Sequence, residues 1–209
     1  MPASLDAGDY DCAAAVYDEL ARKRNAHFKV VGLAGLAAVA MRRGDLARAV
    51  ALFGELRGNR TRVPPVWTDI ASEYLAMCHA VSGNVERADS WLDDSETLTP
   101  ITATAYAVVG CRDNRLQEVA GLAAAPLRRV DARLFSHEVR VFHLMRAFAK
   151  AACEEPVADD LMYARPAFAG ELDYLTADWP ALRDFIARHP LPALGVAEDA
   201  ELPTARVIR

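Results

Sequence analysis

The sequence has no long uninterrupted apolar run. Its longest candidate, residues 30–41, falls short of the about 18 to 20 apolar residues that a membrane-spanning helix needs. The first residues, Met-Pro-Ala-Ser-Leu-Asp, lack the basic start and apolar core of a secretory signal. We therefore expect a cytoplasmic chain with no membrane association.

Positive charge is also scarce. The chain has 24 Lys and Arg against 29 Asp and Glu, a formal net charge of -5. A surface for nucleic acid needs clustered Lys and Arg facing the phosphates. The basic stretches at 57–62 and 128–129 are short and flanked by acids, so we expect no nucleic-acid partner.

Motifs that carry chemistry are missing as well. There is no Cys-x-x-Cys pair, no glycine-rich phosphate loop and no Gly-x-Ser-x-Gly elbow. His143 follows His137-Glu138 six residues after the first histidine, whereas the zinc helix of metalloproteases needs histidines four residues apart. We expect no enzymatic activity, no catalytic residue, no bound metal and no cofactor. The widely spaced cysteines are typical of reduced, buried thiols: Cys12, Cys78, Cys111 and Cys153.

A repeated phrase is what the sequence does contain. The pattern Gly, Asp or Asn, apolar, x-x-Ala-x-x-x-large occurs at residues 8–17, 44–53 and 83–92, and the copies begin 36 and 39 residues apart. That period is typical of arrays of helical hairpins. The small residue of each copy, which lets two helices approach closely, is Ala13, Ala49 or Ala88, and the large one is Tyr17, Phe53 or Leu92.

The rest of the pattern predicts an all-α chain. Apolar residues recur every three or four positions, and Gly, Asn or Pro separates the runs. Gly32 and Gly35 indicate a helix-packing surface. Beyond residue 131 the phrase is undetectable, and prolines interrupt the apolar residues that follow. We expect a helical array over 1–153, a C-terminal helical cap over 154–190 and a loose tail over 191–209.

These repeats resemble tetratricopeptide repeats. In the second copy Leu33, Leu36, Ala37 and Ala40 match the first-helix pattern, and Ala49 and Phe53 match the second. The resemblance covers about residues 8–126, and it departs from the family in lacking the first-helix tryptophan and in its longer period. It implies an α-solenoid of about three to four helical hairpins. Another kind of α-solenoid and a non-repeating bundle are the alternatives.

In this family the first helix of each hairpin lines a concave groove, so the resemblance implies a peptide-binding surface there. Mapped by position, the groove holds Val31, Ala34, Ala38, Met41, Arg42, Ile70, Glu73, Met77, Ile101, Thr104 and Val108. This set is mostly apolar and contains methionine, which suits an amphipathic helix or apolar segment of a partner protein. Alternatively, the chain's own C-terminal helices fill the groove.

The sequence therefore predicts a non-enzymatic adaptor or chaperone-like interaction module. Its excess of Arg over Lys and its many alanines suggest a bacterial, GC-rich source. Two other hypotheses stay open. One is a structural subunit that stacks or oligomerises through its array, and the other is a small helical enzyme or metal protein whose site is assembled from scattered residues.

Overall fold

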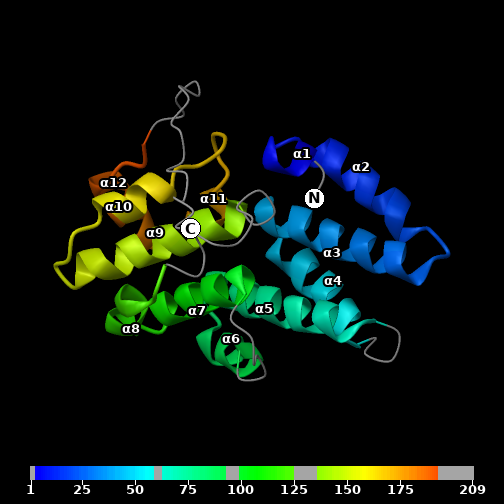
Figure 1. Ribbon diagram of the computed structural model, residues 1–209, viewed down its shortest axis with the longest axis horizontal. Coiled ribbons are helices and arrows are strands. Elements are labelled where there is room, and N and C mark those ends of the chain that lie inside the picture. The colour runs from blue at the N-terminus through cyan, green and yellow to red at the C-terminus, as the bar shows by residue number, and fades with distance from the viewer. Residues whose placement is uncertain (1–2, 59–62, 93–98, 125–135, 193–209) are drawn as a thin grey trace, which may run out of the picture.

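The computed structural model describes residues 3–58, 63–92, 99–124 and 136–192 (Figure 1). Every element in these ranges is a helix, which confirms the all-α prediction. None of these helices has the length and apolar character needed to span a membrane. The basic stretch 128–129, most of the stretch 57–62 and nearly all of the tail 191–209 lie outside the described residues.

The helices follow one another in antiparallel pairs, each packed on the next. The pairs are α1 (Ala3–Asp6) with α2 (Tyr10–Ala21), α3 (Ala26–Arg42) with α4 (Leu46–Gly58), α5 (Pro65–Val81) with α6 (Val85–Leu92), α7 (Pro100–Arg112) with α8 (Leu116–Gly121), and α9 (Ser136–Ala152) with α10 (Ala158–Tyr163). The first helices α5, α7 and α9 also pack side by side. This arrangement is the predicted α-solenoid.

One turn geometry joins the two helices of every pair in the described ranges. Its left-handed residue is Gly8, Gly44, Gly83, Asn114 or Glu154, with φ of 78°, 80°, 79°, 60° and 59°. The next residue donates its amide to the carbonyl five positions back: Asp9 to Ser4, Asp45 to Ala40, Asn84 to His79, Arg115 to Gly110 and Glu155 to Lys150, at 2.8 to 2.9 Å. This is the Schellman ending of a helix, for which glycine is the favoured residue. The turn at Glu154 therefore makes α9 and α10 a further hairpin, beyond the reach of the repeated phrase.

Replacing Glu154 by glycine should stabilise the protein by about 1 kcal/mol, because a residue with a Cβ is strained in the left-handed region. Glu154 is exposed, so the substitution removes no packing. Glu155→Gly is the matched control, since Glu155 is also exposed but has no positive φ. Urea unfolding of both variants is the measurement. A gain for Glu155→Gly, or a loss for Glu154→Gly, would contradict the turn assignment.

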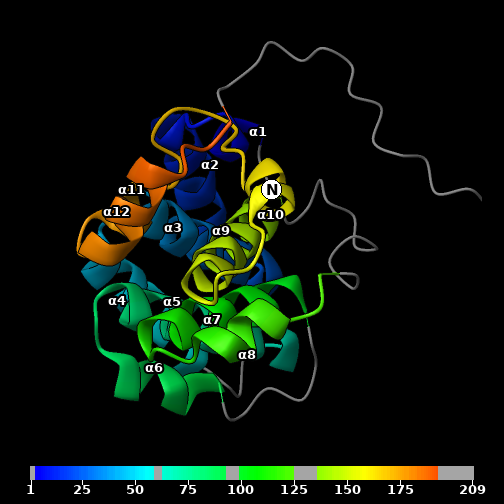
Figure 2. The same ribbon diagram turned by 90° about the vertical axis from the view of Figure 1, so that its left-hand side faces the viewer.

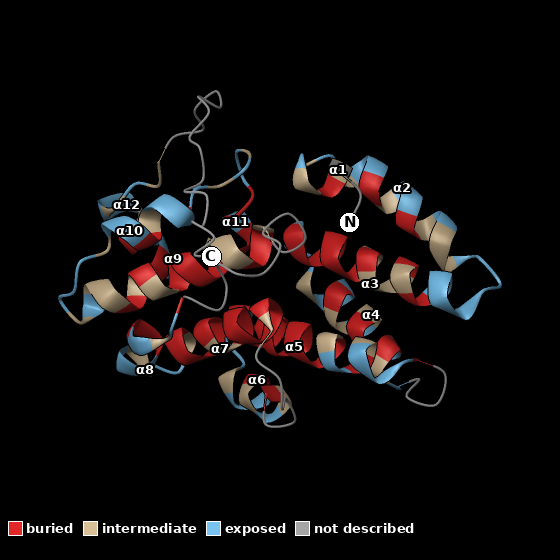
Figure 3. Ribbon diagram, viewed as in Figure 1, coloured by how far each residue is buried: buried red, intermediate tan, exposed pale blue. Residues whose placement is uncertain are grey.

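Small residues bring the helices together at the predicted positions. Ala13, Ala49 and Ala88 are fully buried, and the large residues that follow them are nearly so. Phe53 stacks on Tyr74 of the next hairpin, with ring centroids 4.9 Å apart. In Figure 3 buried residues run along α3, α5, α7 and α9, whereas α6, α8, α10 and α12 present exposed residues. The first helix of each hairpin therefore carries most of the core.

Residues 154–190, which we expected to form one helical cap, lie in two places. Helix α10 pairs with α9, whereas the following stretch, residues 164–191, packs on the other side of α9 and carries α11 (Asp173–Thr176) and α12 (Pro180–Arg188) (Figure 2). We call this stretch the return segment, because it contacts earlier hairpins. Its successive aromatic residues reach four of them: Phe168 lies against Gly8, Tyr174 near Gly44, Trp179 under Arg112 and Phe185 against Phe148.

Candidate functional site

The predicted groove is largely covered by the chain itself. Eight of its eleven residues are buried, and only Val31, Ala34 and Ile70 are half-buried. Glu73 faces the start of α7, where its carboxylate accepts hydrogen bonds from Thr99 and Thr102. Arg42 and Thr104 both contact Glu138 of α9. Glu138 was not among the predicted groove residues.

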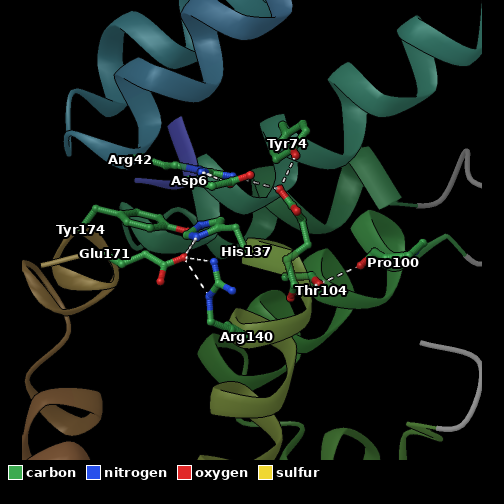
Figure 4. Close-up of polar contacts among 10 residues, drawn as sticks. Asp6, Arg42, Tyr74, Pro100, Thr104, His137, Arg140, Glu171 and Tyr174 are labelled. Atoms are coloured by element: carbon green, nitrogen blue, oxygen red, sulfur yellow. Dashed lines mark hydrogen bonds and ion pairs between the residues drawn. The ribbon is translucent and has the colours of Figure 1, made fainter. Parts of the chain in front are cut away.

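Glu138 takes part in a buried polar group drawn from five helices. Its other members, Asp6, Arg42, Tyr74 and Thr104, are labelled in Figure 4. The Glu138 side chain is 1% exposed, and its Oε1 accepts a hydrogen bond of 2.6 Å from the Tyr74 hydroxyl. Arg42 Nη2 lies 3.8 Å from the same oxygen, and Arg42 Nη1 lies 3.4 Å from Asp6 Oδ1. The Thr104 hydroxyl lies 2.9 Å from the Glu138 carbonyl. Because an uncompensated buried charge is costly, the ion pairs hold α1, α3 and α9 relative to one another, and the hydrogen bonds of Tyr74 and Thr104 add α5 and α7.

The neighbouring His137 connects this group to the return segment. His137 Nδ1 lies 2.8 Å from Glu171 Oε1, and its Nε2 lies 3.0 Å from the Tyr174 hydroxyl. Arg140 donates to the same Glu171 oxygen through Nε and Nη2 at 2.9 and 2.6 Å, and the Ala167 amide donates to Oε2. A neutral His137 satisfies both contacts, with Nδ1–H donating to Glu171 and Nε2 accepting from Tyr174. We call Arg140, His137, Glu171 and Tyr174 the latch.

Burial and hydrogen bonding together set the protonation states of His137, Glu171 and Tyr174. Burial lowers the pKa of His137, and the positive charge of Arg42 lowers it further, so the imidazole is neutral at pH 7. Burial alone would raise the pKa of Glu171, but hydrogen bonds from His137, Arg140 and the Ala167 amide bring it down to about 2. Burial also raises the pKa of Tyr174 well above its ordinary value, and therefore disfavours the phenolate that a nucleophilic tyrosine would need. A neutral His137, an ionised Glu171 and a protonated Tyr174 are suited to holding helices together rather than to reacting with a substrate.

A second buried carboxylate holds α10 against α9. Asp160 is 1% exposed and contacts His143 Nδ1 at 2.7 Å, Arg146 Nη1 at 3.0 Å and Lys150 Nζ at 2.8 Å. Burial opposes its ionisation, but these partners lower its pKa to about 2. The two histidines six residues apart in the sequence thus face different carboxylates. Within the described residues no group of three or more His, Cys, Asp and Glu is placed to hold a metal ion.

The sequence carried one signal for these clusters. His137, Glu138 and His143 interrupt an otherwise apolar stripe of α9, and polar side chains at core positions call for partners. Nothing in the pattern names those partners, because the hydrogen bonds span 34 residues from His137 to Glu171 and 64 from Tyr74 to Glu138.

Comparison with known proteins adds no assignment. No protein-family model matched the chain, and searches of curated proteins and of solved structures found no match.

Lowering the pH should destabilise the protein in two stages. In the unfolded state His137 binds a proton near pH 6.5, whereas in the folded state its lowered pKa keeps it neutral to lower pH. Stability is therefore lost as the pH falls below about 6.5. His79, whose pKa burial also lowers, adds to this stage. Glu171 and Asp160 have folded pKa values of about 2, against 4.5 and 3.8 for the free groups, so the stability they contribute is lost as the pH falls from about 4.5 to 2.

Thermal unfolding followed by circular dichroism across this pH range is the measurement. His137→Gln keeps a donor and an acceptor but does not titrate, so it should remove most of the first stage and leave the second. A thermal midpoint that stays constant from about pH 6.5 to 5 in the unmodified protein would contradict the neutral, buried His137.

Proposed function

We propose that this protein is a non-enzymatic protein-interaction scaffold, a tetratricopeptide-like solenoid that binds its partner on the outer surface of the array. The observation that carries the proposal is the array of successive hairpins in which eight of the eleven predicted groove residues are buried and two of them, Arg42 and Thr104, contact Glu138 of α9. Arrays of helical hairpins present extended surfaces on which other chains bind. The composition supports a bacterial cytoplasmic setting.

Exposed apolar side chains near both ends of the array support binding there. Val16 on α2 and Phe28 on α3 are 42% and 47% exposed, and Met162 and Tyr163 on α10 are 68% and 40% exposed. Single exposed apolar residues are common on protein surfaces, but the ends of a solenoid are also where an apolar face lacks a neighbouring repeat. A partner protein that covers either end would bury them.

A photo-crosslinking residue placed at one exposed position at a time, in the native host, tests the proposal. Phe28 and Met162 are the two test positions, and the exposed Ser90 on α6 is the control. Crosslinking of one discrete partner from a test position and not from Ser90 would support the scaffold function. An absence of crosslinked protein at both test positions would contradict it.

Self-stacking is the second candidate function, and the exposed residues at opposite ends of the array favour it. If copies associate end to end, sedimentation should show oligomers that grow with concentration, and Met162→Glu should abolish them by placing a charge in the contact. A concentration-independent monomer would exclude this candidate and leave the adaptor function standing.

A further inference from the structure

The turn between α2 and α3 carries a run of basic residues. Residues 22–29 read Arg-Lys-Arg-Asn-Ala-His-Phe-Lys, and all eight are exposed. They carry four Lys or Arg residues, a histidine and no acid, in a chain whose formal net charge is -5. We call residues 22–29 the basic turn.

Local ion pairs neutralise only part of this charge. Arg22 pairs with Asp18 and Lys23 with Glu19, both at 2.6 Å between exposed side chains one helical turn apart. Pairs of this kind are weak and screened by salt. Arg24 and Lys29 have no ion-pair partner among the described residues, so four cations less two carboxylates leave a local excess of two positive charges.

Helix stability accounts for Arg22 and Lys23 at the C-terminal end of α2, where cations are favourable, but not for Lys29. His27 and Lys29 lie in the first turn of α3, the positive end of the helix dipole, where acidic residues are favourable and cations are not. The side chain of Asn25 accepts hydrogen bonds from the amides of His27 and Phe28, at 2.9 and 3.4 Å, and so caps this helix end. The cap fixes the backbone of the turn. The exposed side chains of the basic turn are then the groups that can contact a partner.

Phe28 supplies an apolar contact within the charged surface. Its side chain is 47% exposed, and its ring centroid lies 6.0 Å from that of His27. An aromatic ring surrounded by charge is the composition of a binding anchor with a polar rim.

We propose that the basic turn docks a short acidic segment of a partner protein, with an apolar side chain of that segment covering Phe28. The inference rests on the proposed scaffold function and names its surface. Charge complementarity selects the partner: a short acidic peptide can contact the turn alone, whereas an anionic membrane or a nucleic acid also meets the long-range repulsion of a chain with net charge -5. Four cations are also few for a surface that must track a phosphate backbone.

Binding of a fluorescein-labelled peptide of alternating Glu and Leu to the full chain, followed by fluorescence anisotropy, tests the proposal. The peptide should bind with an affinity that falls as salt rises, and the double reversal Arg24→Glu with Lys29→Glu should weaken binding by about tenfold or more. Phe28→Ala should weaken it by about threefold to tenfold and keep the salt dependence. A peptide of alternating Glu and Ser should bind the unmodified protein and Phe28→Ala alike.

The double reversal Arg48→Glu with Arg87→Glu is the matched control. Both residues are exposed, both lie in the first turn of a helix, as Lys29 does, and the change in net charge is the same. This control should bind within about twofold of the unmodified protein, because it leaves the local charge at the turn intact. Equal weakening by the two double variants, or no binding of the Glu-Leu peptide to the unmodified protein, would overturn the proposal.

Two further probes decide between partners. Vesicles of phosphatidylserine and phosphatidylcholine, and a single-stranded oligonucleotide, are measured with the same variants. Tighter binding to either one than to the peptide, lost on reversal at Arg24 and Lys29, would overturn the choice of a protein partner. In the crosslinking experiment, a partner captured from Met162 but not from Phe28 would overturn this inference and leave the scaffold function standing. Capture from neither position would overturn the scaffold function itself.

Discussion

Replacing Glu171 by alanine should destabilise the protein by about 3 to 5 kcal/mol, the range for removal of one partner of a buried ion pair. The carboxylate is fully buried and accepts hydrogen bonds from His137, Arg140 and the Ala167 amide. Without it, the Arg140 guanidinium, with a side chain only 14% exposed, loses its acceptor beside His137. Urea unfolding followed by tryptophan fluorescence measures the loss.

The matched control for Glu171 is Asp173, an exposed acid two residues later. Asp173→Ala should cost no more than about 1 kcal/mol, since it removes only a favourable charge at the start of a short helix. Adding Arg140→Ala to Glu171→Ala should recover part of the loss, because the cation no longer lacks a partner. A cost for Glu171→Ala as small as that for Asp173→Ala, or no coupling to Arg140, would mean that the latch does not hold the return segment.

Gly32→Ala should cost about 3 kcal/mol, at the upper end of overpacking effects, and should loosen α2 before the rest of the array. A Cβ at Gly32 would lie 2.2 Å from the Ala21 amide nitrogen and 2.6 Å from the Tyr17 carbonyl oxygen. Both are backbone atoms, so no side-chain rotation relieves the clash and α2 must move away from α3. Hydrogen exchange should therefore show protection lost first in α2, with α5 and α7 retained.

Gly54 in α4 provides the opposite case. Apart from its two chain neighbours and the backbone of its own helix, no atom lies within 4 Å of the position of its added Cβ. Gly54→Ala should therefore stabilise the protein by about 0.5 to 1 kcal/mol through helix propensity. If Gly32→Ala and Gly54→Ala change the free energy of unfolding by similar amounts, α2 and α3 do not approach each other closely at Gly32. The predicted packing surface at Gly32 and Gly35 is confirmed by geometry, since a Cβ at Gly35 would lie 2.1 Å from the Tyr17 ring.

Local sequence patterns predicted the repeat unit well, because they report on neighbours within one or two helical turns. The glycines at 8, 44 and 83 occupy left-handed turns, which glycine favours. Ala13, Ala49 and Ala88 lie at close helix contacts, where a small side chain is needed. The presence of a glycine does not predict the left-handed turn at Glu154. Its φ is 59°, although no glycine occupies the position.

The predicted groove shows what local patterns cannot predict, namely which segments of the chain cover a helix face. Its residues were assigned by helix face, and the sequence kept open the alternative that the chain itself covers that face. The latch could not be derived in that way. Glu171 occurs in a stretch interrupted by prolines, and only the return of that stretch along α9 brings it to His137 and Arg140.

The all-α class, the hairpin period and the small residues at helix crossings could be predicted from the sequence, since each depends on intrinsic backbone preference or on spacing within a helix. The further hairpin at Glu154, the burial of the predicted groove residues and the pairing of buried charges follow from long-range packing. These depend on how successive hairpins curve, which brings Arg42 of α3 to Glu138 of α9 across much of the chain. A buried ion pair of that kind is fixed by the sum of many small packing angles, and no single segment encodes it.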